Sequence, residues 1–580
     1  MVFNVLLYIS LGIFSLGLVF KIFTWFSQKI GFGAEAFTTS SRLAAAVKGI
    51  AGIIFSLKLF TLVKVFFLDV IFQIRTLKED PLRWLMHILL VWGFMLLLLM
   101  HALDGIVTEK LFTDYYSTLN PYLFLRNLFG AMVVVGLLLA LSRRLIFKVP
   151  RLKTNAMDYY AIIILAVIMV SGILLEGMQI ASPTVFAEME EEYAALDDEA
   201  DIQALESLWV KEYGLASATV KAPFDPEVIE SGRELNEESC VSCHASNKWA
   251  FTGYATARML RPVAVGLDRA GAVNFLWYLH FLACFVGLAY LPFSKMFHII
   301  ATPVSLLANS VMSRETSRRE NIITRQIIEL DACTHCGTCS RYCSAMMASK
   351  ARGNPYILPS EKMGILKAMV RGKKLSPAER GAVVEGVYLC TNCDRCTVVC
   401  PSGINLRELW LTVREDLVQK EGTAPMMLSP FSLVRGLNRK DLPEETYAKP
   451  LQETQKALAG EFDAITKPDS LFDLSKEADK EGLHSGDNTF ACCFGCQTCT
   501  TVCPVVKNYD NPVESLGLLP HQIMYCLGSG LTEAASGARM LWVCLTCYQC
   551  QEHCPQQVKV TDLFYELKNM AVQKLENQLN

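Results

Sequence analysis

Five stretches of this 580-residue chain are continuously apolar and long enough to cross a bilayer as helices, which takes about 20 residues. They run approximately from Val2 to Phe23, Leu82 to Leu103, Tyr122 to Phe147, Asp158 to Ile180 and Val273 to Ile300. A sixth stretch, Ile50 to Gln73, carries its polar residues on one broad helical face: Lys58, Thr61, Lys64, Asp69, Gln73 and Arg75. This pattern favours a helix lying in the membrane surface. A sixth crossing helix is the alternative.

The charges between these stretches predict the orientation, because Lys and Arg near membrane ends stay on the cytoplasmic side. With five spans and an outer N-terminus, the cytoplasm receives the basic segments 21–48, 75–83, 143–153 and 314–319. The outside receives the acidic loop 104–114 and a long insertion, 181–272, that opens with many Glu and Asp residues. We therefore predict an inner-membrane protein with a cytoplasmic C-terminal part. The first stretch lacks a basic start and a small-residue cleavage site, so we interpret it as an anchor.

Four histidines lie in the apolar stretches, where ionisable residues are costly and usually functional. His87 and His101 are fourteen positions apart, about 40° short of whole helical turns. His280 and His298 are eighteen apart, which is five full turns of one helix, with Pro292 expected to kink it. In antiparallel helices, His87 meets His298 near the cytoplasm and His101 meets His280 near the outside. Each pair is predicted to bind one haem b. Hydrogen-bonded packing histidines are the alternative.

The run HFLACFVGLAYLPFSKMFH, from His280 to His298, resembles the last helix of the gamma subunit of respiratory nitrate reductase and related di-haem cytochromes b. This resemblance implies that the membrane part holds two haems b and exchanges electrons with a quinone such as menaquinone.

A different haem motif lies in the insertion 181–272. Cys240, Cys243 and His244 form the CxxCH pattern of a covalently attached haem c. Zinc is the alternative, but the insertion has no further Cys or His to complete a zinc shell. Methionine is a common sixth ligand in cytochromes c, so we favour Met259 over Met189.

Cysteine is the strongest chemical signal, since sixteen of the 21 cysteines form four runs of the type C-x2-C-x2-C-x3-C. The runs consist of Cys333, Cys336, Cys339 and Cys343; Cys390, Cys393, Cys396 and Cys400; Cys493, Cys496, Cys499 and Cys503; and Cys544, Cys547, Cys550 and Cys554. This is the bacterial ferredoxin pattern, in which three thiolates bind one 4Fe-4S cluster and the fourth binds the partner cluster. Zinc families do not favour this spacing. Four 4Fe-4S clusters are therefore predicted.

The crossover rule assigns four thiolates to each cluster. The predicted sets are Cys333, Cys336, Cys339 with Cys400; Cys390, Cys393, Cys396 with Cys343; Cys493, Cys496, Cys499 with Cys554; and Cys544, Cys547, Cys550 with Cys503. Between the paired runs, Leu, Met and Val recur at helical intervals, so helical ferredoxin domains are expected.

The first pair of runs resembles the ferredoxin part of the glycolate oxidase iron-sulfur subunit. The second pair, CCFGCQTCTTVCPVV with LWVCLTCYQCQEHCPQQVKV, resembles the C subunit of heterodisulfide reductase. Cys284, Cys492 and Cys526 fall outside the pattern, and we interpret them as packing residues, with Cys492 as an alternative to Cys493.

The fold class that these patterns predict is mainly α, and five segments are expected. A five-helix transmembrane di-haem cytochrome b domain is expected at residues 1–180 and 273–310, and an outer cytochrome c insertion at residues 181–272. Two bis-4Fe-4S ferredoxin domains are expected at residues 311–421 and 489–580, with a linker at residues 422–488 between them.

The predicted function is electron transfer. A net charge of −3 gives no indication of a nucleic-acid partner, and the sequence has no dinucleotide fingerprint, P-loop or CCG motif. The main hypothesis is a membrane subunit of a quinone-linked redox complex, with a cytoplasmic flavin or iron-sulfur oxidoreductase as partner, either heterodisulfide-reductase-like or a dehydrogenase. A quinone-independent conduit to an outer cytochrome is the second hypothesis. A redox sensor is the third, but no output domain follows the clusters.

Overall fold

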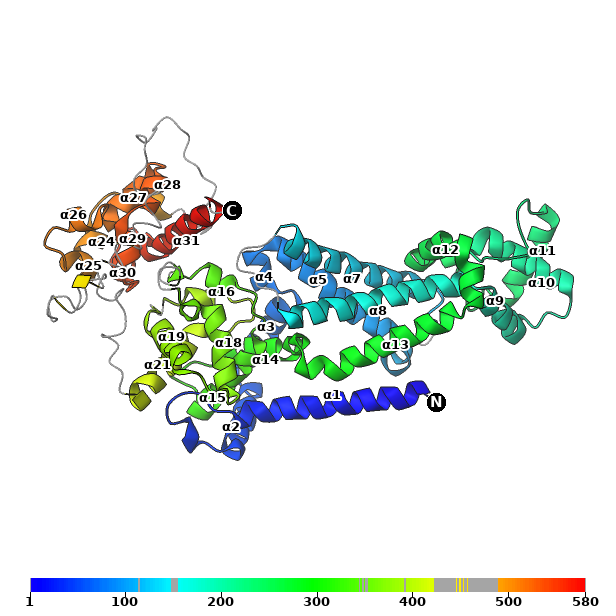
Figure 1. The fold of residues 1–580 in the computed structure, drawn as a ribbon, viewed down its shortest axis with the longest axis horizontal. Coiled ribbons are helices and arrows are strands. Elements are labelled where there is room, and N and C mark those ends of the chain that lie inside the picture. Colours follow the sequence, from blue (N-terminus) through cyan, green and yellow to red (C-terminus); the bar gives the residue numbers. More distant parts are fainter. Residues whose placement is uncertain are drawn as a thin grey trace. The chain divides into compact units, whose positions relative to one another are not determined.

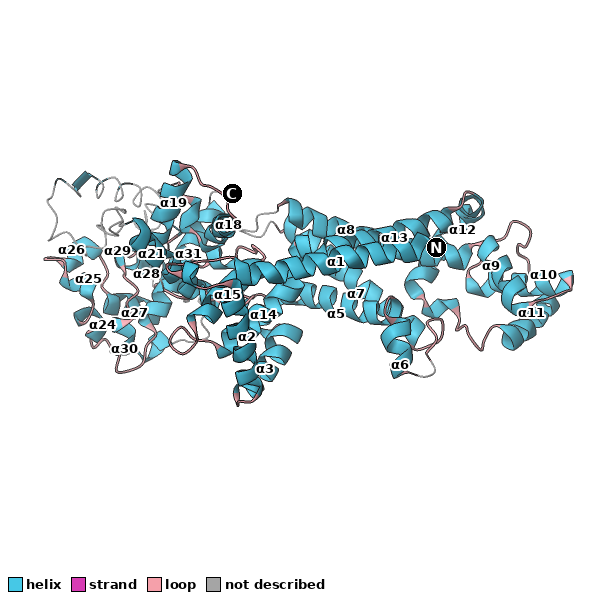
Figure 2. Ribbon diagram, turned by 90° about the horizontal axis from the view of Figure 1, so that it is seen from below, coloured by secondary structure: helices cyan, strands magenta, loops and turns pink. Residues whose placement is uncertain are grey.

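The computed structural model describes residues 2–112, 115–147, 155–343, 345–346, 349, 353–390, 393–421 and 489–578, with isolated positions between 445 and 456. Every regular element in these ranges is helical, which confirms the mainly α fold (Figure 2). The predicted linker 422–488 lies outside the described residues, except for those isolated positions. The chain divides into two compact units. Unit 1 contains Met1–Ile22, Ile71–Val149 and Thr154–Phe297, and unit 2 contains Phe23–Val70, Pro150–Lys153 and His298–Asn580.

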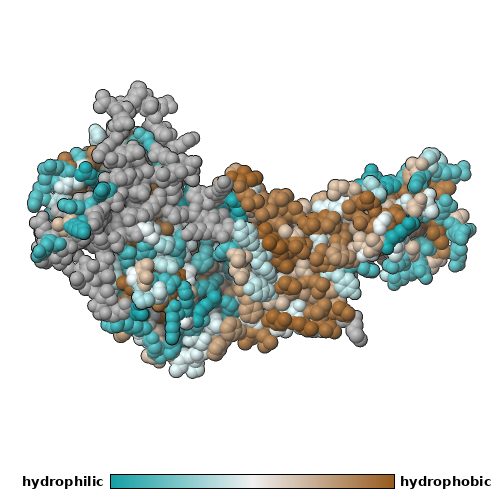
Figure 3. All heavy atoms as spheres, viewed as in Figure 1, coloured by the Kyte–Doolittle hydropathy of each residue, from teal (hydrophilic) through white to brown (hydrophobic). Residues whose placement is uncertain are grey.

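Five helices are long and apolar enough to cross a membrane (Figure 1). They are α1 (Val2–Ser27), α5 (Pro81–His101), α7 (Tyr122–Leu145), α8 (Ala156–Ala181) and α13 (Ala272–Tyr290), which a 3-10 turn continues to Phe293. Apolar side chains cover these helices in unit 1, whereas hydrophilic residues are frequent around α10 and α11 (Figure 3). The chain therefore has the helices of a membrane protein, and five predicted apolar stretches correspond to them.

The last predicted span is wrong at its C-terminal end. The sequence suggested one helix from Val273 to Ile300, but α13 ends at Tyr290 and two 3-10 turns follow before α14 (His298–Val311) begins. Pro292 lies in the first of these turns, and proline lacks the N–H that would continue the helix. His280 and His298 therefore belong to two different helices, and the count of five turns between them does not apply.

The predicted surface helix from Ile50 to Gln73 is not continuous, and its position in the membrane surface stays a prediction. Two helices occupy this region, α2 (Thr39–Ile54) and α3 (Lys58–Val65), and a π-helical turn extends α3 to Ile71. They meet at an angle of 95°. By length and composition the bent pair could count as a sixth span, so the alternative of six spans remains open.

Local sequence explains where the spans of unit 1 begin. Asp80 precedes Pro81, the first residue of α5, and its carboxylate accepts a hydrogen bond from the Arg83 amide. The first turn of α5 is therefore capped. Asn155 and Asp158 form a reciprocal capping box at the start of α8. Glycines let α5 and α7 approach closely, since a Cβ at Gly93 would meet the Phe129 carbonyl at 2.9 Å.

The insertion 181–272 folds into four helices: α9 (Pro183–Met189), α10 (Glu199–Leu208), α11 (Pro226–Ser239) and α12 (Phe251–Arg269). A small apolar core unites the first three, with Leu205, Trp209 and Ile229 buried. Helix α12 packs along α8, where a Cβ at Gly177 would meet the Thr256 side chain at 2.6 Å. The insertion is thus a small domain with its own core and one helix on the membrane bundle.

Unit 2 contains both cysteine-rich regions. The first comprises α15 (Arg319–Ala332), α16 (Thr338–Arg341), α18 (Pro359–Val370), α19 (Pro377–Tyr388), α20 (Arg395–Val398) and α21 (Leu406–Glu421). The second comprises α24 (Thr498–Thr501), α25 (Pro504–Lys507), α26 (Pro512–Leu516), α27 (Pro520–Gly528), α28 (Thr532–Ser536), α29 (Arg539–Val543), α30 (Gln549–Glu552) and α31 (Val560–Gln578). Among the described residues both regions are helical, as predicted.

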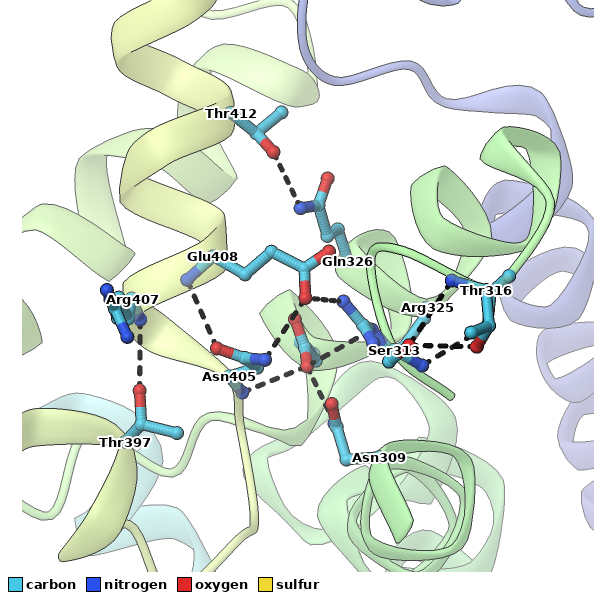
Figure 4. A network of polar contacts seen from close by, with 12 residues as sticks. Asn309, Ser313, Thr316, Arg325, Gln326, Thr397, Asn405, Arg407, Glu408 and Thr412 are labelled. Atoms are coloured by element: carbon cyan, nitrogen blue, oxygen red, sulfur yellow. Dashed lines mark hydrogen bonds and ion pairs between the residues drawn. The ribbon is translucent and has the colours of Figure 1, made fainter. Parts of the chain in front are cut away.

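A buried polar network joins α14, α15 and α21 (Figure 4). Arg325 is 1% exposed and lies 2.5 Å from the Glu408 carboxylate and 3.8 Å from Glu329. Glu329 also accepts hydrogen bonds from the Asn309 side chain (2.7 Å) and the Asn405 amide (3.0 Å). One buried cation thus compensates two buried carboxylates, and the network fixes the segment that follows Cys400.

Removing this cation should be costly. We expect Arg325→Met to destabilise the protein by about 3–5 kcal/mol, because Glu329 and Glu408 would remain buried without a counter-charge. Arg314→Met is the matched control, since the Arg314–Glu415 pair is more than 40% exposed on both sides and should contribute less than about 1 kcal/mol. Chemical denaturation of the detergent-solubilised protein would measure both. Equal losses of stability in Arg325→Met and Arg314→Met would contradict the assignment of Arg325 as the counter-charge of the two buried carboxylates.

The pH dependence of stability should report on Glu329. Burial raises the pKa of Glu329, an effect that Arg325 opposes. A raised folded-state pKa means that stability falls as the pH rises from the ordinary glutamate value, about 4.3, towards the raised one. Glu329→Gln removes this titration and keeps an acceptor for Asn309 and Asn405. The melting temperature of Glu329→Gln relative to wild type should therefore increase with pH, and a constant difference would contradict this account.

Candidate functional site: cysteine cavities and membrane histidines

The same local backbone recurs in all four cysteine runs. The residue after the second cysteine of each run has a left-handed conformation and starts a four-residue helix that carries the third cysteine. These residues are Gly337 (φ 78°), Asp394 (φ 68°), Gln497 (φ 62°) and Tyr548 (φ 62°). Three of the four are not glycine, and such conformations persist only where the surrounding structure requires them.

Three of the four predicted thiol sets each line one cavity. Cys343, Cys390, Cys393 and Cys396 line the first of these cavities. Cys493, Cys496, Cys499 and Cys554 line the second, and Cys503, Cys544, Cys547 and Cys550 line the third. In each cavity the structure brings together three cysteines of one run and the last cysteine of the other.

The fourth set is brought together as well. Burial raises the pKa of Cys400 to about 12, and the neighbouring thiols that add to this effect are Cys336 and Cys333. Cys339 is affected in the same way by Cys336, Cys333 and Cys400, and less strongly by Cys396 of the neighbouring set. The thiols that influence one another therefore follow the crossover pattern in this set too.

The geometry of these sets fits a polynuclear cluster. Each set surrounds a space instead of converging on one point, and within the described ranges no three Cys, His, Asp or Glu side chains are placed to bind a single metal ion. Burial raises the pKa of Cys343 to about 12 and that of Cys550 to about 12, so the free thiols stay protonated at neutral pH. Positively charged iron would be needed to hold them as thiolates.

The remaining cysteines are placed differently. Cys492 is exposed and Cys493 lines its cavity, which favours Cys493 as the member of the set. Cys526 packs against the core of the second region. Cys284 lies on α13 with its sulfur 4.0 Å from His280 Nε2.

In unit 1 the structure brings His101 and His280 together. Their ring centres are 6.2 Å apart. Metal–imidazole bonds of about 2.0 Å imply a separation of roughly 6 Å for two rings on opposite sides of one iron. His280 Nδ1 lies 3.1 Å from the Ile168 carbonyl, and donation of its proton there leaves Nε2 as the metal-binding nitrogen. Gly172 makes room for the ring, because a Cβ there would lie 2.9 Å from His280.

His87 is oriented in a similar way. Its Nδ1 lies 2.7 Å from the Gln73 side-chain oxygen, which would accept the Nδ1 proton and leave Nε2 available. Gln73 has a left-handed backbone, φ 53°, that ends the π-helical segment before it. His298 is the first residue of α14 in unit 2, so its predicted pairing with His87 stays a prediction.

The CxxCH motif forms a single tight turn after α11. The amides of Cys243 and His244 both donate to the Cys240 carbonyl, at 3.1 and 2.9 Å. The Ala245 amide donates to the Thr118 carbonyl at 3.0 Å, which ties the turn to the loop before α7. Burial lowers the pKa of His244, so the neutral imidazole that haem iron needs is the favoured form. The residues thus fit a haem c.

Met259, the predicted sixth ligand, lies on α12 and is 74% exposed. The buried face of α12 is formed by other residues, namely Gly253, Thr256, Ala257 and Ala264. The assignment of Met259 stays a prediction.

Two polar clusters were missed in the sequence. Glu176 on α8 forms a 2.9 Å ion pair with Arg126 and accepts a hydrogen bond from Asn127 at 3.1 Å, both on α7. Ionisable residues in apolar helices could have revealed this cluster. The second is the buried Lys362, which lines the cavity of Cys343, Cys390, Cys393 and Cys396. Its sequence position in an ordinary amphipathic helix gives no signal.

Comparison with known proteins identifies the cysteine-rich regions. Residues 329–404 and 489–558 each match the family described as the 4Fe-4S dicluster domain. The chain therefore contains two 4Fe-4S dicluster domains. No solved structure matches the chain significantly.

Three relatives share parts of the chain. The D subunit of dihydromethanophenazine:CoB–CoM heterodisulfide reductase from Methanosarcina barkeri is 33% identical over 112 residues, 17% of this chain and 27% of the relative. The E subunit of the same organism's enzyme is 31% identical over 134 residues, 20% of this chain and 48% of the relative. EtfAB:quinone oxidoreductase of Syntrophomonas wolfei is 20% identical over 399 residues, 61% of this chain and 48% of the relative. The chain thus spans about a quarter to a half of the length of these relatives.

The crossover assignment can be tested by spectroscopy. We expect Cys400→Ser and Cys336→Ser to perturb the same reduced-cluster EPR signal, and Cys343→Ser and Cys393→Ser to perturb another. Loss of one cubane should lower the iron content outside haem from about sixteen to about twelve atoms per chain. Cys526→Ser is the control and should leave the signals unchanged. If Cys343→Ser perturbed the signal that depends on Cys336, the runs would bind clusters without crossover.

Proposed function

We propose that this protein is a membrane electron-transfer subunit of a respiratory redox complex. It passes electrons between four cytoplasmic 4Fe-4S clusters, two haems b, a menaquinone-type pool and an outer haem c. Clusters and haems supply reversible one-electron chemistry, and the residues of this chain hold and insulate them. The observation that carries the proposal is the convergence of five predicted ligand sets: four sets of thiols, and the His101–His280 pair at 6.2 Å.

Contacts within unit 2 support a short path from the proposed haem ligand His298 to the first cluster. Thr302, one turn after His298 on α14, donates to the Ala332 carbonyl at 3.3 Å, directly before Cys333. A Cβ at Gly403, three residues after Cys400, would meet the Leu306 side chain of α14 at 2.5 Å. Helix α14 therefore begins with a proposed haem ligand and packs against both ends of the first thiol set.

The orientation follows from the charge bias of the loops. The N-terminus and the CxxCH domain lie outside, and the dicluster domains lie in the cytoplasm. There they would dock a flavin or iron-sulfur oxidoreductase, such as a heterodisulfide-reductase-like enzyme or a dehydrogenase. The named activities of the relatives, heterodisulfide reduction and quinone reduction, support this class of partner.

A second candidate is a conduit without a quinone site, linking a cytoplasmic oxidoreductase directly to outer cytochromes. The CxxCH turn favours it, because a haem c outside the membrane would offer electrons to a protein partner. The match to a quinone oxidoreductase along 61% of the chain favours the first candidate.

Reduction by quinol distinguishes the two candidates. We expect a menaquinol analogue to reduce the haems b of the anoxically purified protein, as followed by their absorbance. His101→Leu should remove about half of the haem b and leave the covalent haem c. Cys243→Ser should remove the covalent haem c and leave both haems b. Haems b that do not respond to quinol would favour the conduit, and absence of b-type absorbance in the wild type would refute the membrane part of the proposal.

A further inference from the structure

The cavity of Cys343, Cys390, Cys393 and Cys396 differs from its counterparts in charge. Its lining contains three basic residues, Lys362, Arg395 and Arg407, against one acidic residue, Asp394. Neither of the two cavities in the second dicluster domain has a Lys or Arg in its lining. The fixed positive charge is therefore concentrated at one of these three thiol sets. In the fourth set, the largest influences on the pKa of Cys339 and Cys400 likewise include no Lys or Arg.

Lys362 is the most deeply buried of the three basic residues. It lies on α18, is 2% exposed, donates to the Gly386 carbonyl at 3.1 Å, and has its ammonium 4.7 Å from the centre of the Trp410 ring. Within the described ranges no carboxylate forms an ion pair with it. Arg395, by contrast, lies 3.9 Å from the Glu566 carboxylate. A buried ammonium is stable only beside compensating negative charge.

The thiols of this cavity are the candidate source of that negative charge. Burial raises the pKa of Cys343 and Cys396, and the charge of Lys362 acts against the rise in both. Lys362 therefore lies within electrostatic range of two members of the set. A thiolate-bound 4Fe-4S cluster has a net negative charge, which would compensate the ammonium.

We propose that Lys362 is the counter-ion of the cluster bound by Cys343, Cys390, Cys393 and Cys396, and that it gives this cluster the highest reduction potential of the four. The inference rests on the proposed function only in that these thiols hold a 4Fe-4S cluster. Reduction adds one electron, drawn from a neighbouring cluster, and no proton, so the reduced form is more negative. A fixed positive charge in a water-poor site stabilises that form over the oxidised one.

This cavity lies where the two dicluster domains meet, so a high reduction potential here would affect electron transfer between the domains. Tyr565 on α31 of the second dicluster domain is 1% exposed, and the thiols that influence its hydroxyl are Cys393 of this cavity and Cys544 of another. A shared core of Met346, Leu358, Ala571 and Val572 joins the two domains at the same place. Electrons that enter either domain would thus collect at the cluster nearest the junction.

The test is an EPR-monitored redox titration of the full-length, cluster-loaded protein. Lys362→Met should shift the highest midpoint potential to a more negative value and leave the other three unchanged. Lys362→Arg keeps the charge and should keep the potential. Lys367→Met, on the same helix but paired with Asp331 at 2.9 Å and partly exposed, is the matched control and should shift no potential.

A second measurement covers the case in which Lys362→Met fails to assemble. In the otherwise wild-type protein, Cys393→Ser should alter the signal that is reduced first, because that signal belongs to this cavity. The proposal is overturned if Lys362→Met leaves the highest potential in place, or if Cys393→Ser alters a signal reduced later. A wild-type iron content far below four clusters would instead refute the proposed function, so the two failures are distinguishable.

Discussion

Burying thiols in groups of four is the constraint on which the C-terminal half of the molecule depends. Burial raises the pKa of these cysteines, and the charges of neighbouring thiolates raise it further, so they cannot ionise together without a positive charge between them. A cluster of iron ions supplies that charge and binds the thiolates that would otherwise repel one another. This explains why short helices and left-handed turns, which have little stability of their own, can surround each cavity. The four equivalent turns at Gly337, Asp394, Gln497 and Tyr548 are one solution used four times.

In the proposed haem sites of the membrane part, histidines take the role that thiols have in the cluster sites. An imidazole in an apolar bundle needs a defined partner for Nδ1, so that Nε2 can face a metal. The Ile168 carbonyl serves His280, and the Gln73 side chain serves His87. In both cases the partner comes from a different segment than the histidine. Small residues such as Gly172 and Gly93 allow the close helix contacts that these arrangements require.

Regular patterns in the sequence predicted much of this arrangement. Apolar length indicated the five long helices, and cysteine spacing indicated two dicluster domains and which thiols meet. What the sequence did not reveal depends on how distant segments pack. Pro292 was expected to kink a helix, whereas it lies in a turn that ends one. No proline lies at the 95° bend between α2 and α3, so the sequence pattern did not predict the bend. Gln73, Glu176 and Lys362 acquire their importance only through residues far away in the chain.

The break at Pro292 has a consequence for electron transfer that a continuous helix would lack. A straight helix of α13 would carry His298 onward along the bundle axis, and its end would be free to point away from the cysteines. With the chain broken, His298 starts a separate helix that belongs to the same compact unit as the clusters. Helix α14 then packs on α15, whose last residue precedes Cys333, and Leu306 of α14 packs against Gly403 beyond Cys400. The proposed haem ligand His298 and the residues that flank two ligands of the first cluster are therefore held by contacts of one helix within one compact unit.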